Sequence, residues 1–274
     1  MATPTPQPLH WSTDDLAGSC VIVTGGTRGV GLGIVEAFLG AGCTVIVGSR
    51  STPDEEGRPQ VVGPDGEVRT ATYLAVDVRD AEQAGWLVEA AIAEAGRVDL
   101  VINNAGGAPS ADAATASPRF STSIINLNLL SALHVAQAAN AVMQNQPGGG
   151  QIINISSVSG LRPSPLTAAY GAAKAGLISL TESLAVEWAP KVRVNCISAG
   201  ILDTGHADEH YVGDEGLARV AATVPLGRLG TPGDIAGLCM LLASPLSAYV
   251  TGANLVAHGG GEWPAFHGAA NAAK

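Results

Sequence analysis

The stretch CVIVTGGTRGVGLGIVEAFLGAG, residues 20 to 42, contains a strand pattern, a glycine-rich turn and a helix pattern in that order. Its first four residues are an unbroken apolar run, which is typical of a strand buried on both faces. After the glycines, apolar side chains recur at helical spacing, at Ile34, Val35, Phe38 and Leu39. A dinucleotide-binding fingerprint requires this order of elements, so the stretch predicts a nucleotide-binding α/β fold.

The turn TGGTRGVG has the spacing G-x-x-x-G-x-G, with glycines at 25, 29 and 31. Glycine lets the backbone bend sharply and approach a pyrophosphate at a helix N-terminus, where amide groups and the helix dipole favour anions. An ordinary glycine-rich turn is the alternative interpretation. If the loop binds a nucleotide, we expect the contacts to come from Gly25, Thr27, Arg28, Gly29, Val30 and Gly31.

The second strand, Thr44 to Val47, indicates which nucleotide is bound. An acidic residue at its end would bind the ribose 2′-hydroxyl of NAD, whereas a basic residue suits the 2′-phosphate of NADP. No acid stands at Ser49, Arg50 follows it, and Arg28 of the glycine loop can reach the same place. Two guanidinium groups can grip a phosphate, so the sequence favours NADP(H) over NAD(H). Either arginine could instead face solvent, and three nearby acids would weaken the case if they approached the phosphate: Asp54, Glu55 and Glu56.

The segment from Ser51 to Arg69 is rich in proline, glycine and charged residues. A doubly wound fold usually has a crossover helix here, but this composition is poor helix material. Its piece VVGPDGEV, residues 61 to 68, predicts a small hairpin instead. We assign no function to this segment.

Two further strands end at residues suited to a cofactor. The strand at 72 to 76 is followed by Asp77 and Val78. Asp77 could accept a hydrogen bond from an adenine amino group, or it could cap the next helix. The strand at 98 to 102 is followed by NNAG at 103 to 106, where small residues allow close backbone approach and the amides can pin the turn. We expect cofactor contacts from Asp77, Val78, Asn104, Ala105 and Gly106.

The segment from Arg119 to Asn145 has the pattern of one long helix. Asn126 and Asn128 lie in its apolar interior, where a buried polar side chain needs a partner or a purpose. His134 in the same helix fits a packing or surface position better than a catalytic one.

The stretch IINISSVSGLRPSPLTAAYGAAK, residues 152 to 174, carries the candidate reactive groups. It opens as a strand, passes a Gly/Pro-rich loop and resumes as a helix in which Tyr170 and Lys174 share one face. A phenol has a pKa of about 10 and is a poor base at neutral pH, but a neighbouring ammonium group favours the phenolate. Ser157, at the end of the strand, could hold a substrate oxygen beside that phenol. Such a Tyr and Lys pair is common by chance, so the other motifs decide its meaning.

Composition narrows the class of protein. The 274 residues are 46% hydrophobic and 14% charged, which predicts one large α/β domain with a sizeable core. A net charge of −10 argues against nucleic acid or an anionic membrane as partner. We find neither a signal-peptide pattern nor a membrane-spanning apolar run, so we expect a cytoplasmic protein. We expect no metal site and interpret the four cysteines as reduced core residues: Cys20, Cys43, Cys196 and Cys239.

Strand and helix patterns alternate throughout the chain, which predicts a doubly wound α/β fold, a parallel sheet with helices on both faces. After the reactive stretch come a helix to 189, strands at 193 to 197 and 253 to 257, and a capped helix between them. Right-handed crossovers place the carboxyl ends of all strands along one edge, where ligands bind. We expect a loose arm at 1–17, a single catalytic domain at 18–262 and a tail at 263–274.

With these motifs in order, the sequence resembles the short-chain dehydrogenase/reductase family from about Leu16 to Gly261. TGGTRGVG matches the family pattern T-G-x-x-x-G-x-G, NNAG is the same in both, and Tyr170 with Lys174 matches Y-x-x-x-K. The family serine lies thirteen residues before the tyrosine, which selects Ser157 over Ser156.

The resemblance implies a three-layer α/β/α Rossmann fold with a seven-stranded parallel sheet. It also implies an enzyme that acts on CH–OH groups and interconverts a secondary alcohol and a ketone with NADP(H). Tyr170 would exchange a proton with the substrate oxygen and Ser157 would polarise that oxygen. Lys174 would lower the pKa of Tyr170 and bind the nicotinamide ribose. The family asparagine, which holds a water of a proton relay, falls on Asn128, with Asn126 as the weaker candidate.

The chain departs from the family pattern at two places. The usual Pro-Gly after the sixth strand is Ala199-Gly200 here, which could loosen the nicotinamide end of the cofactor site. The residues that would hold the nicotinamide carboxamide follow it: Gly200, Ile201 and Thr204. The irregular segment at 51 to 69 replaces the usual crossover helix beside the adenosine half of the cofactor site.

The substrate is a small carbonyl or alcohol compound that the sequence does not identify. The region expected to cover it, 203 to 224, contains His206, His210 and Tyr211, each either a substrate contact or an exposed loop residue. Relatives that reduce 3-oxoacyl thioesters look similar, but we see no obvious basic patch for an acidic carrier protein.

Two other functions stay open, and the resemblance also implies an assembly. A cofactor-binding regulator or scaffold without turnover is one alternative, although the complete set of reactive residues disfavours it. Epimerisation or dehydration is the other, although relatives with those activities usually carry a T-G-x-x-G-x-x-G loop. Family habit implies a homotetramer packed through the helices at 119–145 and 168–189.

Overall fold

A computed structural model of the chain describes residues 11–205, 213–264 and 266. Seven parallel strands form one sheet in the order β5-β2-β1-β6-β7-β8-β9. Their bounds are β1 Cys20–Thr24, β2 Thr44–Ser49, β5 Thr72–Ala75, β6 Leu100–Asn103, β7 Gly150–Ser157, β8 Val192–Ala199 and β9 Asn254–Ala257. The predicted doubly wound Rossmann fold with a seven-stranded parallel sheet is confirmed.

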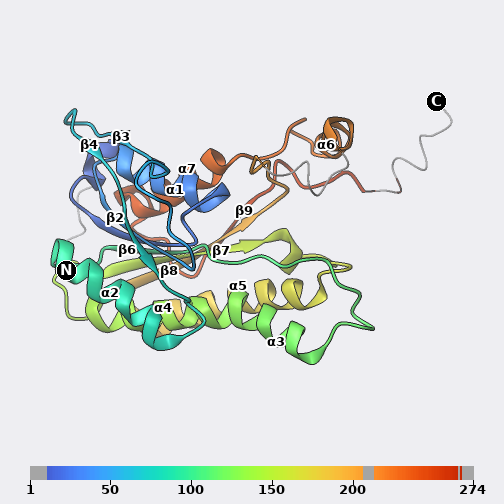
Figure 1. Cartoon of the computed structure of the whole chain (residues 1–274), viewed down its shortest axis with the longest axis horizontal. Coiled ribbons are helices and arrows are strands. Elements are labelled where there is room, and N and C mark those ends of the chain that lie inside the picture. Colours follow the sequence, from blue (N-terminus) through green and yellow to red (C-terminus); the bar gives the residue numbers. More distant parts are fainter. Residues whose placement is uncertain (1–10, 206–212, 265, 267–274) are drawn as a thin grey trace, which may run out of the picture.

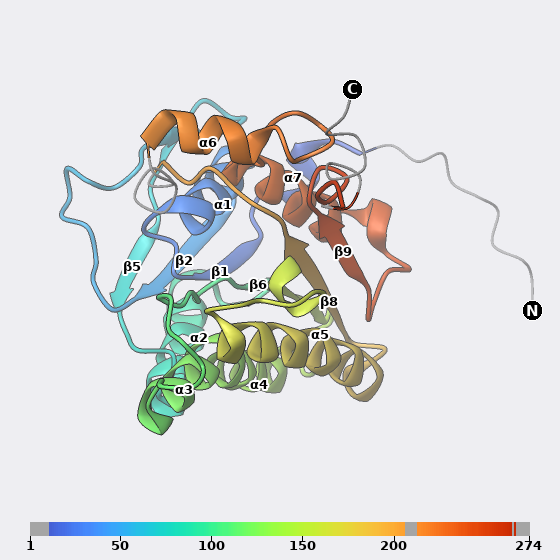
Figure 2. The ribbon, with the colours of Figure 1, turned by 90° about the vertical axis from the view of Figure 1, so that its right-hand side faces the viewer.

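Helices cover both faces of this sheet. The helices are α1 Gly29–Gly40, α2 Ala81–Ala95, α3 Pro118–Ile125, α4 Ser131–Met143, α5 Ala168–Trp188, α6 Gly213–Ala221 and α7 Pro232–Ala243. Figures 1 and 2 show α1 and α7 on one face and α2, α4 and α5 on the other. No helix within the described ranges combines the length and the apolar character that a membrane crossing needs.

The sheet order reverses at β1, and this reversal creates the ligand edge. β1 pairs with β2 on one side and with β6 on the other, and all of the pairs in this sheet are parallel. The loops after β1 and β6 therefore leave neighbouring strands toward opposite faces, which opens a crevice between them.

Two apolar clusters, one on each face, hold the layers together. Phe38 and Ile235 belong to the cluster under α1 and α7. Leu87, Val135 and Leu184 belong to the cluster under α2, α4 and α5. The four cysteines are buried and free, as predicted.

The segment after β2 confirms the predicted hairpin. β3 Val61–Val62 and β4 Val68–Arg69 pair antiparallel, and the described segment contains no crossover helix. Val61 packs beside the end of α1, where a Cβ on Gly40 would lie 3.5 Å from it. The hairpin thus lies at the carboxyl end of α1, away from the edge where the strands end.

Two other elements differ in detail from the sequence-based expectation. The long helix expected at 119 to 145 is divided by a π-helical turn, η2 Asn126–Leu130, between α3 and α4. The last part of the segment expected to be a loose arm forms a short 3₁₀ helix, η1 Thr13–Leu16, and buries Leu16 in the core.

The Leu87 side chain of α2 fills the space that a side chain on Gly48 of β2 would need, which gives a test of the packing. Leu87 is fully buried, so Leu87→Ala should lower the free energy of unfolding by about 2–5 kcal/mol. A Cβ on Gly48 would lie 2.7 Å from Leu87, so Gly48→Ala alone should cost about 1–3 kcal/mol. In urea unfolding, the double variant should lose clearly less than the sum of the two.

Gly150→Ala is the matched control for this pair. Its Cβ would lie 2.4 Å from Met143 instead of Leu87. Its effect should therefore add to that of Leu87→Ala. Additive effects for Gly48 and Leu87 as well would show that the two positions do not share this space.

Candidate active site

Every described candidate site residue lies at the carboxyl-terminal edge of the sheet or on a helix that borders it. The glycine loop follows β1, and Arg50, Asp77, Asn104, Ser157 and Gly200 lie at or just beyond the ends of their strands. Tyr170 and Lys174 lie in the first two turns of α5, and Asn128 lies in η2. His206, His210 and Tyr211 fall outside the described residues.

Thr24 joins the glycine loop to the turn after β6. Its Oγ1 accepts hydrogen bonds from the backbone N–H groups of Asn104 and Ala105, both at 3.0 Å. The Asn104 side chain donates to the carbonyls of Thr24 at 3.0 Å and Gly25 at 3.1 Å. A Cβ on Gly31 would lie 2.2 Å from the Gly25 oxygen, so a larger residue would break this arrangement. Sequence reasoning did not single out Thr24, whose signal is its position between a buried strand and the glycines.

Ser157 and Tyr170 lie within hydrogen-bonding reach of each other in the reactive stretch. Burial raises the pKa of Tyr170, and the hydrogen bond from Ser157 lowers it by less. The expected lowering by Lys174 is therefore absent from this arrangement, and the net direction is upward. The Lys174 Nζ lies over the Tyr170 ring, 5.6 Å from its centroid, within the range of a cation–π contact. The phenol is protonated at neutral pH.

Lys174 is itself buried. Its side chain is 3% exposed and its Nζ donates to the Ile155 carbonyl at 2.7 Å. Burial lowers the pKa of Lys174 from 10.5 to about 8. Desolvation penalises the ammonium form, so the ordinary preference of a lysine for its charged form is much reduced here.

Asn128 lies against the same group of residues. Its amide donates to the carbonyls of Gly107 at 2.9 Å and Ile124 at 3.0 Å, and its oxygen accepts from the Gly107 N–H at 2.8 Å. A Cβ on Gly106 would lie 2.7 Å from the Asn128 oxygen and 3.2 Å from Lys174 Nζ. Asn128 is 1% exposed whereas Asn126 is only partly buried, so the structure brings Asn128 rather than Asn126 to this group.

Asp77 already has a partner within the chain. Its carboxylate pairs with the Arg79 side chain, which lowers the pKa of Asp77, with a smaller contribution from Arg50. Asp77 does not cap the following helix, because the N-cap of α2 is Asp80. Val78 is buried in the core, so only its backbone faces the edge.

Arg28 and Arg50 are both exposed at this edge, each close to the end of its element. The positive charge of Arg50 helps to lower the pKa of Asp77, so Arg50 lies near the loop that follows β5. Asp54, Glu55 and Glu56 are also exposed, and Asp54 caps its own turn by accepting from the Gly57 N–H at 2.9 Å.

The segment after β8 lies over the glycine loop. A Cβ on Gly29 would lie 3.5 Å from Thr204. A Cβ on Gly200 would lie 2.7 Å from the His258 backbone, so glycine is required there although the preceding residue is Ala199. Gly200 and Ile201 border a cavity of about 250 Å³.

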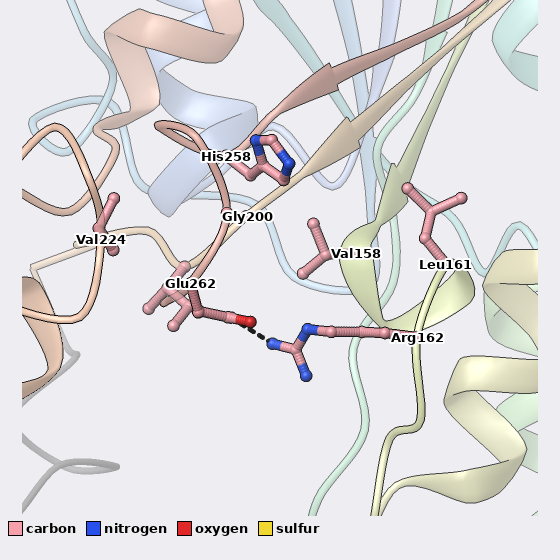
Figure 3. A pocket seen from close by; sticks show the side chains of 9 residues that line it. Val158, Leu161, Arg162, Gly200, Val224, His258 and Glu262 are labelled. Atoms are coloured by element: carbon pink, nitrogen blue, oxygen red, sulfur yellow. Dashed lines mark hydrogen bonds and ion pairs between the residues drawn. The ribbon is translucent and has the colours of Figure 1, made fainter. Parts of the chain in front are cut away.

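This cavity brings in residues that sequence reasoning missed. Figure 3 shows Arg162 and Glu262 joined by an ion pair across it, with His258 on the same segment as Glu262. They come from the loop after β7 and from the segment after β9. The sequence signal for a turn here is the run of three glycines at 259 to 261. All three have positive φ, a conformation that glycine adopts readily.

Comparison with known proteins agrees with this geometry. A family model described as enoyl-(acyl carrier protein) reductase matches residues 25–262. L-rhamnose 1-dehydrogenase (NAD(P)(+)) from Azotobacter vinelandii is 35% identical over 89% of this chain and 97% of its own length. The 3-oxoacyl-(acyl-carrier-protein) reductase of Chlamydia muridarum is 36% identical over 89% of this chain and 98% of its own.

A solved structure shows the same fold. The ligand-free aldohexose dehydrogenase from Thermoplasma acidophilum superposes with a TM-score of 0.81 and 28% identity, over 90% of this chain and 95% of that one. The relatives are named as dehydrogenases and reductases of diverse substrates, which agrees with an oxidoreductase acting on alcohols or ketones with NAD(P). The chain belongs to the short-chain dehydrogenase/reductase family.

Proposed function

We propose that this protein is an NADP(H)-dependent oxidoreductase that interconverts a secondary alcohol and a ketone through Ser157, Tyr170, Lys174 and Asn128. One observation carries the proposal: Ser157 and Tyr170, within hydrogen-bonding reach of each other, lie beside a buried Lys174 at the edge that the glycine loop borders. A phenol, a hydroxyl and a buried amine at a ligand edge are suited to proton exchange with a substrate oxygen.

Tyr170 donates a proton to the carbonyl oxygen during reduction and accepts one from the alcohol during oxidation. Its raised pKa keeps the phenol protonated at neutral pH, which is the form that donates during reduction. Ser157 donates a hydrogen bond to the same oxygen and stabilises the charge that develops there. The nicotinamide, when bound, supplies or takes the hydride.

Lys174 and Asn128 complete the proton path. A lysine ammonium has three donors, and one of them is used by the Ile155 carbonyl. The others are available for the nicotinamide ribose and for a water held near Asn128. Protons can then return to Tyr170 from solvent through Lys174.

The residues at the edge fit a dinucleotide. Gly25 and Gly31 leave room that side chains would fill, and the hydrogen bonds of Thr24 hold the loop in that open form. Arg28 and Arg50 are exposed guanidinium groups that can bind the 2′-phosphate, which favours NADP(H). Asp77 would accept from the adenine while it remains paired with Arg79. Thr204 and the backbones of Gly200 and Ile201 would hold the carboxamide.

The family resemblance also favours a homotetramer. Val186 of α5 is 81% exposed and Leu130, the last residue of η2 just before α4, is 37% exposed. Apolar side chains exposed on these helices support packing between subunits through this face.

Tyr170→Phe should lose at least about a hundredfold in kcat for any ketone that the wild type reduces, because the proton donor is gone. NADPH binding, followed by its fluorescence, should be retained. Tyr249→Phe is the matched control, because Tyr249 is fully exposed and should keep wild-type activity. A Tyr170→Phe variant with wild-type turnover would remove Tyr170 from the mechanism.

Arg28→Ala and Arg50→Ala should each lower kcat/KM for NADPH by about tenfold or more, since each removes a charge-assisted hydrogen bond to phosphate. Values with NADH should change little. Arg97→Ala is the control, because Arg97 pairs with Asp99 before β6, at the other edge of the sheet. A wild-type preference for NADH would contradict the assignment.

Lys174→Met should abolish turnover and yet raise the free energy of unfolding of the ligand-free protein at pH 7 by about 1–3 kcal/mol. The native pKa of about 8 lies below the ordinary 10.5, so the burial penalty is complete below pH 8 and falls as the pH rises toward 10.5. Urea unfolding at pH 7 and pH 9.5 should show a smaller gain at the higher pH. Lys191→Met, at an exposed lysine, should show no such trend; a loss of stability in Lys174→Met at both pH values would contradict the prediction.

A further inference from the structure

The cavity of about 250 Å³ adjoins the reactive end of the site. Its wall begins at Val158, the residue after Ser157, and includes Gly200 and Ile201 from the nicotinamide side. If the proposed function holds, a substrate bound to Ser157 and Tyr170 extends a substituent into this cavity. Nine described residues line it: Val158, Leu161, Arg162, Gly200, Ile201, Val224, His258, Gly261 and Glu262.

The wall that carries Glu262 is held in place by backbone contacts. Gly259, Gly260 and Gly261 have φ values of 63°, 97° and 86°, which turn the chain back after β9. Cβ atoms on Gly259 and Gly260 would lie 2.6 Å from Val224 and 2.9 Å from Pro225, so side chains here would displace the turn. Hydrogen bonds from Leu226 N–H to the Gly259 oxygen and from Trp263 N–H to the Thr223 oxygen, at 3.0 and 3.2 Å, fix both sides.

Arg162 and Glu262 are paired across the cavity from opposite walls. The Arg162 Nη2 donates to Glu262 Oε1 at 2.6 Å, and the two side chains are 43% and 32% exposed (Figure 3). These two are the Asp, Glu, Lys or Arg residues among the nine, and their opposite charges neutralise each other. Apart from His258, the remaining side chains of the wall are apolar.

We propose that this ion pair sets the charge specificity of the substrate: Glu262 occupies Arg162, so the cavity accepts neutral ketones and alcohols and discriminates against carboxylates. An arginine beside an apolar cavity would otherwise bind a substrate carboxylate bidentately. Glu262 both competes for the guanidinium and repels an incoming anion, so the selection rests on a repulsive element. An exposed ion pair is itself worth only about 0–1 kcal/mol, so its removal should leave the fold intact.

The test compares 4-oxopentanoate with its methyl ester, which differ in charge and share the ketone. Binding to the NADP⁺-loaded protein is measured by calorimetry, independently of turnover. Glu262→Gln should bind 4-oxopentanoate at least about tenfold more tightly than the wild type, with little change for the ester. Glu262→Ala should bind 4-oxopentanoate more tightly as well. It is included because the glutamine of Glu262→Gln can still accept a hydrogen bond from Arg162, whereas alanine cannot. Arg162→Gln combined with Glu262→Gln should lose the gain.

Asp65→Asn is the matched control, because it removes one negative charge from the ion pair with Arg69 on the β3–β4 hairpin. It should leave 4-oxopentanoate binding unchanged. Equal binding by wild type and both Glu262 variants, an equal gain in Asp65→Asn, or a gain that survives removal of Arg162 would each overturn the inference. Tighter binding without reduction of any ketone would support this inference and contradict only the proposed function.

Discussion

The hydrogen bonds of Thr24 hold the two halves of the ligand edge in one arrangement. The strand β1 lies where the sheet order reverses, so its end faces the turn after β6 across the crevice. The Asn104 side chain bonds back to the glycine loop and closes the connection in both directions. Gly31 is needed because this connection leaves no space for a side chain: a Cβ on Gly31 would lie 2.2 Å from the Gly25 oxygen. Backbone amides that are already fixed lose little entropy when they bind a ligand.

Lys174 is a buried amine whose charged form is disfavoured by its surroundings. It lies in the second turn of α5, and its Nζ donates a hydrogen bond to the Ile155 carbonyl. A packed apolar side chain would suit the ligand-free fold better. Sites that tune proton transfer commonly hold a group whose charged form is disfavoured, because a pKa near neutrality allows the proton to be exchanged. In the ligand-free arrangement, burial outweighs the hydrogen bond with Ser157 in setting the pKa of Tyr170.

Much of the fold follows from patterns in the sequence, because parallel strands buried on both faces and capped helices are encoded locally. The glycine loop, NNAG and the Tyr170 helix could be placed at one edge because right-handed crossovers leave few alternatives. The π turn at Asn128 could not be predicted, since apolar spacing does not distinguish it from a regular helix. The sequence also did not predict that the pKa of Tyr170 is raised. Spacing indicates that a charge is close to Tyr170, but it does not show that both groups are buried.

The contacts that escaped prediction altogether are those between segments far apart in the chain. Arg162 and Glu262 are separated by 100 residues, and neither belongs to a motif. A motif can be recognised in a sequence because its residues keep a fixed spacing within one turn or at one strand end. A cavity wall needs only that two segments meet, so it has no such spacing. The three glycines after β9 bring these segments together. Their positive φ values turn the chain so that Glu262 meets the loop that follows Ser157. The groups of the proposed reaction therefore follow local spacing in the sequence, whereas the proposed selection of substrate depends on a contact between segments far apart in the chain.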